Sequence, residues 1–261
     1  MTSLFDSAAA CLAERDITQK LAATARLAAA WQNSELTLSP CSLPIDVGRP
    51  EKPELVDARQ LQQRGFGLAV GRAAMIHAIA HIEFNAINLS LDAVCRFTAM
   101  PRAYYDDWVR VAAEEAFHFS LLSSHLQHLG YQYGDFPAHN GLWEMVQETS
   151  YDVLARMALV PRVLEARGLD VTPGLMQKFA EFGNTRMSEI LAIILRDEIG
   201  HVAIGNRWFN YLCTARELDP FPTFITLLKQ HFIGEIKGPF SIPNREKAGF
   251  SAKELAWFCE L

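Results

Sequence analysis

Two short segments of the chain carry the same pattern, an acidic residue followed directly by Glu-x-x-His. They are AEEAFH (residues 113–118) and RDEIGH (residues 196–201). On an α-helix, residues three apart lie about 60° apart around the axis and roughly 4.5 Å apart along it. A glutamate oxygen and a histidine nitrogen at this spacing can therefore bind one metal ion from one helix face.

A single Glu-x-x-His segment is a weak signal, because about one match arises by chance in a chain with eight histidines. Two matches in long predicted helices are much harder to explain as pairs of solvated surface residues. Each match also follows a glutamate in an otherwise apolar helix. Glu83 precedes Glu115 by 32 residues, and Glu165 precedes Glu198 by 33 residues. The chain thus contains the same arrangement twice.

Four carboxylates and two imidazoles on four helices are the ligand set of a dinuclear iron or manganese site in a helical bundle. Buried carboxylates that lie together repel one another, and two cations would neutralise them. We therefore expect two metal ions, with iron as the first choice and manganese or a mixed pair as alternatives. The six expected ligands are Glu83, Glu115, His118, Glu165, Glu198 and His201.

The ligand on the third predicted helix has an alternative. Glu165 lies close to the expected helix end at Gly168 and four residues after Pro161, whereas Glu83 lies in the middle of its helix. Glu148, earlier on the same predicted helix, is the fallback ligand.

Four long helices are expected to position these ligands within residues 61–213. Pro161 should kink the third helix or open a wider turn in it, Gly168 should end it, and Pro173 should start a short extra helix. Helices of this length with short connections predict an all-α fold, a four-helix bundle. Their expected bounds are about 64–98, 103–129, 142–167 and 185–213.

The segment before the bundle, residues 1–60, should combine helices over residues 3–33 with an extended strap over residues 38–54. The strap contains four prolines, which favour extended geometry. Because about 30 residues are too few to form a core, we expect this segment to lie against the bundle. The chain is thus predicted to form one domain, residues 1–261.

A C-terminal extension is predicted over residues 214–261. It should contain a helix at about 221–232, the loop GPFSIPNREKAGF and a short terminal helix. This extension is too small to form a separate domain.

Composition limits the class of protein. Half of the 261 residues are hydrophobic, as in a globular protein, and the net charge of −6 argues against a broad surface for nucleic acid. The chain has no stretch of about 20 uncharged apolar residues and no signal-peptide pattern. Its five cysteines are scattered and form no Cys-x-x-Cys pair. We therefore expect a cytoplasmic protein that does not span a membrane.

The ligand pattern resembles that of the ferritin-like superfamily of dinuclear carboxylate proteins. Three further segments, GRPEKPELV, EARGLD and KGPFSIPNREKAGF, resemble the DUF455 family of ferritin-like proteins, which is related to the tRNA hydroxylase MiaE. The resemblance covers residues 45–250 and implies a ferritin-like bundle.

The resemblance also implies roles for single residues. Glu115 and Glu198 match the ligands that bridge two metal ions. The acids before them, Glu114 and Asp197, match residues that accept a hydrogen bond from a ligand histidine of the other motif and fix its tautomer. The implied pairs are Asp197 with His118 and Glu114 with His201.

These residues and the resemblance together predict an oxidoreductase of the hydroxylase or oxygenase type that activates O₂ and oxidises a small-molecule substrate. A separate reductase would supply electrons, because the chain carries no flavin, nicotinamide or iron–sulfur motif. One alternative is a ferritin-type protein that binds and oxidises iron without an organic substrate. Another is a protein that keeps the fold but not the metal.

A third alternative is a MiaE-like hydroxylase that acts on tRNA. The acidic net charge disfavours it. A tRNA substrate would require a basic face near the metal site, and the candidate residues are Arg102, Arg110, Arg156, Arg162 and Arg167.

Overall fold

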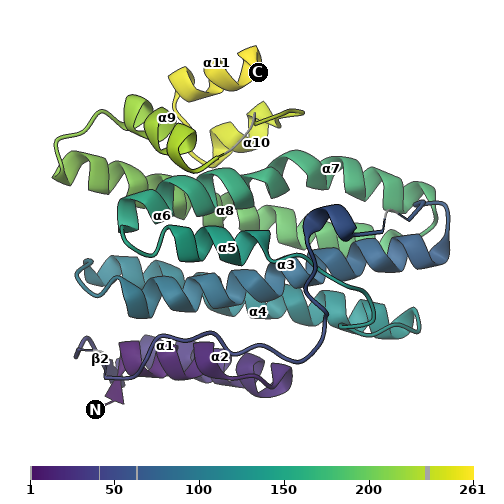
Figure 1. Ribbon diagram of the computed structural model, residues 1–261, viewed down its shortest axis with the longest axis horizontal. Coiled ribbons are helices and arrows are strands. Elements are labelled where there is room, and N and C mark those ends of the chain that lie inside the picture. The colour runs from purple at the N-terminus through teal and green to yellow at the C-terminus, as the bar shows by residue number, and fades with distance from the viewer. Residues whose placement is uncertain (1, 41, 63, 233–235) are drawn as a thin grey trace. The chain divides into compact units, whose positions relative to one another are not determined.

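A computed structural model describes residues 2–40, 42–62, 64–232 and 236–261. Almost all regular secondary structure of the described residues is helical (Figure 1), so the predicted all-α class is confirmed. Among the described residues, β-structure is limited to two strands of two residues each and one isolated bridge. In the same part of the chain, no helix combines the length and the apolar character that a bilayer crossing requires.

The chain divides into two compact units, Met1–Trp143 and Glu144–Leu261. The boundary falls within a short helix, α5 (Gly141–Glu148). Each unit contains one pair of long helical segments, and each is described by itself below. The organisation of the whole chain as one domain stays a prediction.

The first unit is built on two long neighbouring helices, α3 (Ala69–Arg96) and α4 (Arg102–His128) (Figure 1). These are the helices predicted at about 64–98 and 103–129. The second begins directly after Pro101, whose fixed φ suits a helix start. It ends before Gly130, which has a φ of +81° that favours glycine.

The N-terminal segment forms two helices, α1 (Leu4–Ala13) and α2 (Ile17–Gln32), as the sequence predicts. Within the first unit, α1 packs on α3 and α2 packs on α4. The strands β1 (Thr2–Ser3) and β2 (Leu36–Thr37) pair in parallel beside them. The helix α3 is therefore covered on several sides, and all of its residues from 83 to 95 are buried.

The proline-rich strap lies against the first unit, as expected. The backbone N–H of Gly48 donates to Leu12 O at 2.8 Å, and Nη2 of Arg49 donates to Oδ1 of Asn85 at 3.0 Å. A Cβ atom at Gly48 would lie only 2.1 Å from Ala13 O. The strap thus approaches α1 so closely that only glycine fits at this position.

The ammonium group of Lys20 is fully buried beneath the strap. Its Nζ donates to Leu12 O at 2.9 Å, to Gly48 O at 3.0 Å and to Oδ1 of Asn88 at 2.5 Å. Burial, and then the charge of Arg49, lower the pKa of Lys20 to about 7. The three hydrogen bonds of this one lysine connect α1, α3 and the strap.

Replacing Lys20 with methionine should change the pH dependence of stability. The folded pKa lies below the ordinary value of 10.5, so the unfolded chain binds more protons between these two values. Relative to Lys20→Met, the wild type should therefore gain about 1 kcal/mol of unfolding free energy per pH unit. Urea denaturation at pH 7.5, 8.25 and 9 measures this difference. Parallel pH profiles for the two proteins would contradict the expectation.

The second unit is built on α8 (Thr185–Ala215), predicted at about 185–213, and on a helical run packed against it. The run consists of α6 (Val153–Leu159), the π-helical segment η2 (Val160–Glu165) and α7 (Ala166–Glu181). Glu165 therefore lies well inside a continuous helical run.

The predicted bounds of the third helix are wrong. The chain leaves the helix after Glu148 and re-enters it at Val153, so Glu148 and Glu165 lie on different helices. The run also continues through Gly168, and Pro173 lies inside α7 instead of starting a new helix. Tertiary packing against α8 outweighs the local helix-breaking preference of both residues.

Pro161 explains why the run changes its hydrogen-bond pattern without ending. Proline has no N–H and cannot form the ordinary bond to the carbonyl four residues earlier. After it, the N–H of Ala166 bonds to Pro161 O, five residues back, which is the π-helical pattern. The wider turn accommodates the proline, and the helix continues.

The helix α8 comes very close to this π-helical segment at Gly205, where an added Cβ would lie 2.5 Å from Cβ of Pro161. We expect Gly205→Ala to lower the free energy of unfolding by about 1–3 kcal/mol, because this contact has no room to expand. Gly200 on the same helix has open space, so Gly200→Ala should raise it by about 0.5–1 kcal/mol. Urea denaturation of both variants tests the contact, and effects of the same sign would argue against it.

The described residues of the C-terminal extension form three helices, α9 (Pro220–His231), α10 (Ile242–Lys247) and α11 (Ala252–Glu260). The first and last agree with the prediction. The middle helix lies within GPFSIPNREKAGF, which was expected to be a loop. Arg245 in this helix is buried and pairs with Asp170 at 2.7 Å. Tertiary contacts therefore stabilise a helix that the local sequence does not predict.

Candidate metal centre

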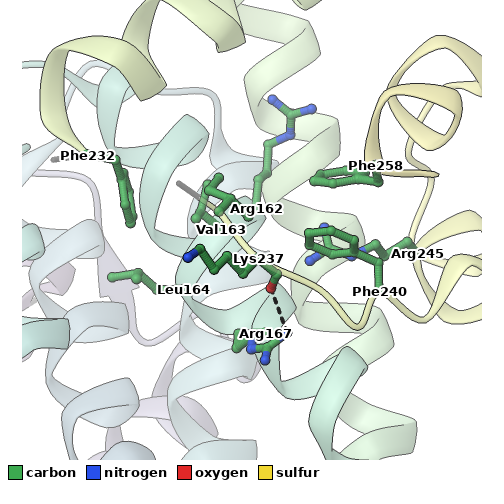
Figure 2. Close-up of a pocket in the computed structure, with 10 residues that line it drawn as sticks. Arg162, Val163, Leu164, Arg167, Phe232, Lys237, Phe240, Arg245 and Phe258 are labelled. Atoms are coloured by element: carbon green, nitrogen blue, oxygen red, sulfur yellow. Dashed lines mark hydrogen bonds between the residues drawn. The ribbon is translucent and has the colours of Figure 1, made fainter. Parts of the chain in front are cut away.

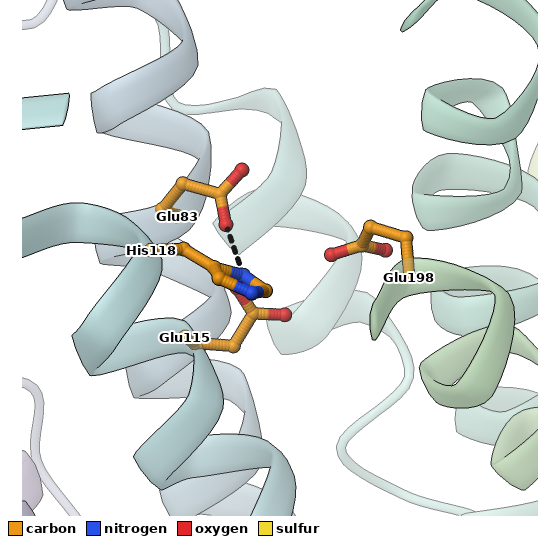
Figure 3. Close-up of side chains that lie close together, drawn as sticks. All are labelled: Glu83, Glu115, His118 and Glu198. Atoms are coloured by element: carbon orange, nitrogen blue, oxygen red, sulfur yellow. Dashed lines mark hydrogen bonds and ion pairs between the residues drawn. The ribbon is translucent and has the colours of Figure 1, made fainter. Parts of the chain in front are cut away.

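Three predicted ligands come together in the first unit. Glu83 on α3 and Glu115 and His118 on α4 are all buried. Nδ1 of His118 lies 3.2 Å from Oε2 of Glu83 and 3.3 Å from Oε2 of Glu115. Figure 3 shows these three side chains turned toward one another. The i,i+3 spacing on α4 and the neighbouring α3 thus direct two carboxylates and one imidazole to one place.

Burial and charge shift the pKa values of the residues in this cluster. Burial and the neighbouring Glu115 raise the pKa of Glu83 to about 8. Burial alone would lower the pKa of His118, but the contacts with Glu115 and Glu83 outweigh it and raise the pKa to about 11. Without a metal ion, these groups therefore retain extra protons near neutral pH.

The same three groups could hold a metal ion. Each offers one ligand atom, and these atoms lie within 4.8 Å of one another. Carboxylate oxygen and neutral imidazole nitrogen suit iron, manganese and zinc. A cation bound here would replace the protons and offset the repulsion between the two carboxylates.

The second unit repeats the pair found on α4. Glu198 and His201 lie three residues apart on α8, and Nδ1 of His201 is 3.3 Å from Oε1 of Glu198. The corresponding distance between His118 and Glu115 is also 3.3 Å. Both side chains on α8 are buried. Each unit therefore contains one buried Glu-x-x-His pair of the same geometry.

Glu165 fits a ligand role better than the alternative Glu148 does. Glu165 is the last residue of the π-helical segment, and only 7% of it is exposed. Glu148 ends α5 with 56% of its side chain exposed, and its Oε2 lies 3.9 Å from Nδ1 of His231. Water already hydrogen-bonds to an exposed carboxylate, so a metal ion would stabilise it little. The assignment of Glu165 to the metal itself stays a prediction.

The acids that precede the two motif glutamates are both half-buried. Asp197 accepts hydrogen bonds from the neighbouring Arg196 at 2.8 and 3.1 Å. Its predicted pairing with His118, and that of Glu114 with His201, join residues of different units. Both pairings stay predictions.

Comparison with known families identifies the family of this chain. The family model described as "Protein of unknown function (DUF455)" matches residues 13–256. The chain belongs to the DUF455 family. The resemblance seen in the sequence is thus confirmed for this family.

One relative of this DUF455 protein is a chain from Haemophilus influenzae, described as an uncharacterized protein. The two are 52% identical over 219 residues, which cover 81% of this chain and 76% of the relative. No solved structure matches the chain.

Two of the five arginines that a basic face for tRNA would require are buried in the second unit. Arg156 and Arg162 are each only 1% exposed. Arg156 donates from Nε to Oγ1 of Thr149 at 2.8 Å, and Arg162 donates from Nε to Oδ1 of Asn206 at 2.6 Å. These two arginines of the DUF455 chain form hydrogen bonds inside the second unit, so they cannot contact a nucleic-acid backbone.

Two further histidines on α3 are buried and form hydrogen bonds within the first unit. His77 accepts a hydrogen bond from the N–H of Gly134 at 2.8 Å, and Nδ1 of His81 lies 2.8 Å from the hydroxyl of Tyr133. Burial lowers the pKa of His77 to about 4 and that of His81 to about 3. Both rings are therefore neutral and connect the loop after α4 to α3.

Sequence reasoning missed that four basic residues line one pocket in the second unit, because it named Arg162 and Arg167 only as candidates for a basic face. The only signal was the density of positive charge in KGPFSIPNREK, which was assigned to a loop. The residues in question are Arg162, Arg167, Lys237 and Arg245.

Proposed function

We propose that the two units of this DUF455 protein together form one dinuclear metal centre. Each unit would supply three ligands, a glutamate from one helix and a Glu-x-x-His pair from the next. The buried cluster of Glu83, Glu115 and His118 carries this proposal, because such a group is costly unless a cation balances it. The ferritin-like relationship is part of the same proposal.

Ligand number favours two joined half-sites over two separate ones. Three side chains leave an iron or manganese ion short of its preferred octahedral ligand number. Four carboxylates match the charge of two divalent cations, so the shared centre would be neutral apart from bound water or substrate. The repeated 3.3 Å Glu–His pair in each unit supports a matched pair of half-sites.

We further propose that the metals are iron and that the protein is an O₂-activating oxidoreductase of the hydroxylase or oxygenase type. Bound iron would supply the electrons that reduce O₂, and a separate reductase would replace them. The chain would hold the metals and limit the access of water. Phe84 and Phe119, which follow Glu83 and His118 in sequence, support this role, with ring centroids 5.7 Å apart.

A small organic substrate fits this proposal better than tRNA does. Arg156 and Arg162 are buried, and the net charge of the chain is −6. Both observations remove support from a substrate with a phosphate backbone.

Metal analysis combined with O₂ consumption tests the proposed activity. Protein from iron-fed cells should contain about two irons per chain by mass spectrometry. After anaerobic reduction, O₂ uptake should begin on mixing and should stop when the iron is removed with a chelator. Stoichiometric zinc, or iron without O₂ uptake, would overturn the oxidoreductase proposal.

A further inference from the structure

A pocket of about 190 Å³ lies in the second unit, beside the π-helical segment and the C-terminal extension. None of its lining residues is a predicted metal ligand. Four of the ten described lining residues are arginine or lysine, and none of these ten is acidic. Figure 2 shows these basic side chains together with the aromatic residues of the extension.

Two of the four basic residues of the pocket form buried ion pairs. Arg245 forms a bidentate pair with Asp170, at 2.9 Å through Nε and 2.7 Å through Nη2. Arg162 pairs with Glu254. Arg167 and Lys237 lie at the exposed side of the pocket, and Nη1 of Arg167 is 3.8 Å from Oδ2 of Asp170.

Buried donors in the pocket lining point to a missing acceptor. Nη1 of Arg245 is buried and has no hydrogen-bond partner, although only 2% of this residue is exposed. Buried polar groups in native proteins almost always form hydrogen bonds, so a guanidinium N–H without an acceptor in a pocket indicates that a ligand binds there. Nη1 of Arg162 is also without a partner, but its guanidinium points away from Arg167 and Lys237 in Figure 2.

The remaining walls are apolar and aromatic. The rings of Phe240 and Phe258 lie 5.0 Å apart between centroids, and Arg245 stacks on Phe258 at 4.2 Å. An engineered cavity of about 150 Å³ is known to hold benzene, so this pocket has room for a group the size of one ring.

We propose that this pocket binds a small organic anion, an aryl or short acyl group that carries a carboxylate or a phosphate. Arg167, Lys237 and Arg245 would bind the anionic group, because guanidinium and ammonium donors match carboxylate and phosphate oxygens. Phe240 and Phe258 would contact the apolar part. Arg167 is held in place by its bonds to the carbonyls of Lys237 and Pro239 at 3.3 and 3.0 Å.

Isothermal titration calorimetry with the full chain tests the ligand class. Benzoate or phenyl phosphate should bind one per chain with a Kd below about 1 mM, the usual range for a small, complementary ligand. Benzyl alcohol, acetate and inorganic phosphate should each bind at least tenfold more weakly. The tighter of the two aryl anions identifies the anionic group. The result should not change after metal removal, which separates this site from the proposed metal centre.

Two variants at the exposed side of the pocket test the residues. Arg167→Met and Lys237→Met should each weaken binding of the aryl anion at least tenfold. Arg186→Met removes the same charge from an exposed position on α8 outside the pocket, and it should change the Kd less than twofold. Equal binding of benzyl alcohol and benzoate, no binding below about 10 mM, or equal effects of all three variants would overturn the proposal.

Discussion

Glu115→Ala should abolish metal binding at one or both positions of the proposed centre. Glu115 is fully buried, and its Oε2 lies 3.3 Å from Nδ1 of His118. As the expected bridging ligand, it would contact both metal ions, so its loss leaves each ion short of an oxygen and the centre short of one negative charge. Mass spectrometry after loading and desalting should find two metals per wild-type chain and one or none in the variant.

The control for this experiment is Glu148→Ala. It removes the same chemical group from an exposed position on α5 and should leave two metals per chain. A second variant, Glu115→Gln, separates metal loss from unfolding, because it keeps the side-chain volume and removes only the charge. Circular dichroism should show that its metal-free form stays helical. Unchanged metal content in Glu115→Ala would reject the ligand assignment.

His201→Ala, a change in the second unit, should remove the protection from amide hydrogen exchange that metal binding gives to the first unit. If the two half-sites share their metals, a ligand lost from α8 weakens binding at α3 and α4 as well. For a ligand at a thousand times its Kd, binding is worth about 4 kcal/mol of stability. Amide hydrogen exchange around Glu83 and His118 should therefore slow by about 1,000-fold on metal loading in the wild type, and by far less in the variant.

A histidine outside the cluster provides the control for this exchange experiment. His128 is exposed at the end of α4, and its ring bonds to Ser124 O. His128→Ala should leave metal-dependent protection unchanged. Full protection of α4 in His201→Ala would mean that the first unit binds its metal alone, and the joint centre would have to be abandoned.

The parts of the site that sequence could predict depend on local geometry. The pairs Glu115–His118 and Glu198–His201 follow from helical spacing alone, because residues three apart share a helix face wherever the helix lies. The burial of Glu83 was foreseeable from its apolar neighbours on α3. In both cases, a regular helix transmits the sequence pattern directly to the structure.

The features that escaped prediction depend on contacts between distant segments. Gly168 was expected to end the third helix, but packing of this run against α8 lets it continue to Glu181. The helix around Arg245 forms because Asp170, 75 residues earlier, accepts its hydrogen bonds. Local helix propensity does not depend on either contact, so the structure of these segments could not be predicted from sequence alone.

Anomalous diffraction from crystals grown with iron or manganese would test the central claim most directly. We expect two peaks about 3.5–4 Å apart, the usual separation in two-metal sites. Glu83, Glu115 and His118 should bind from one unit, and Glu165, Glu198 and His201 from the other. A single peak held by one unit, or no peak near these residues, would contradict the shared dinuclear centre.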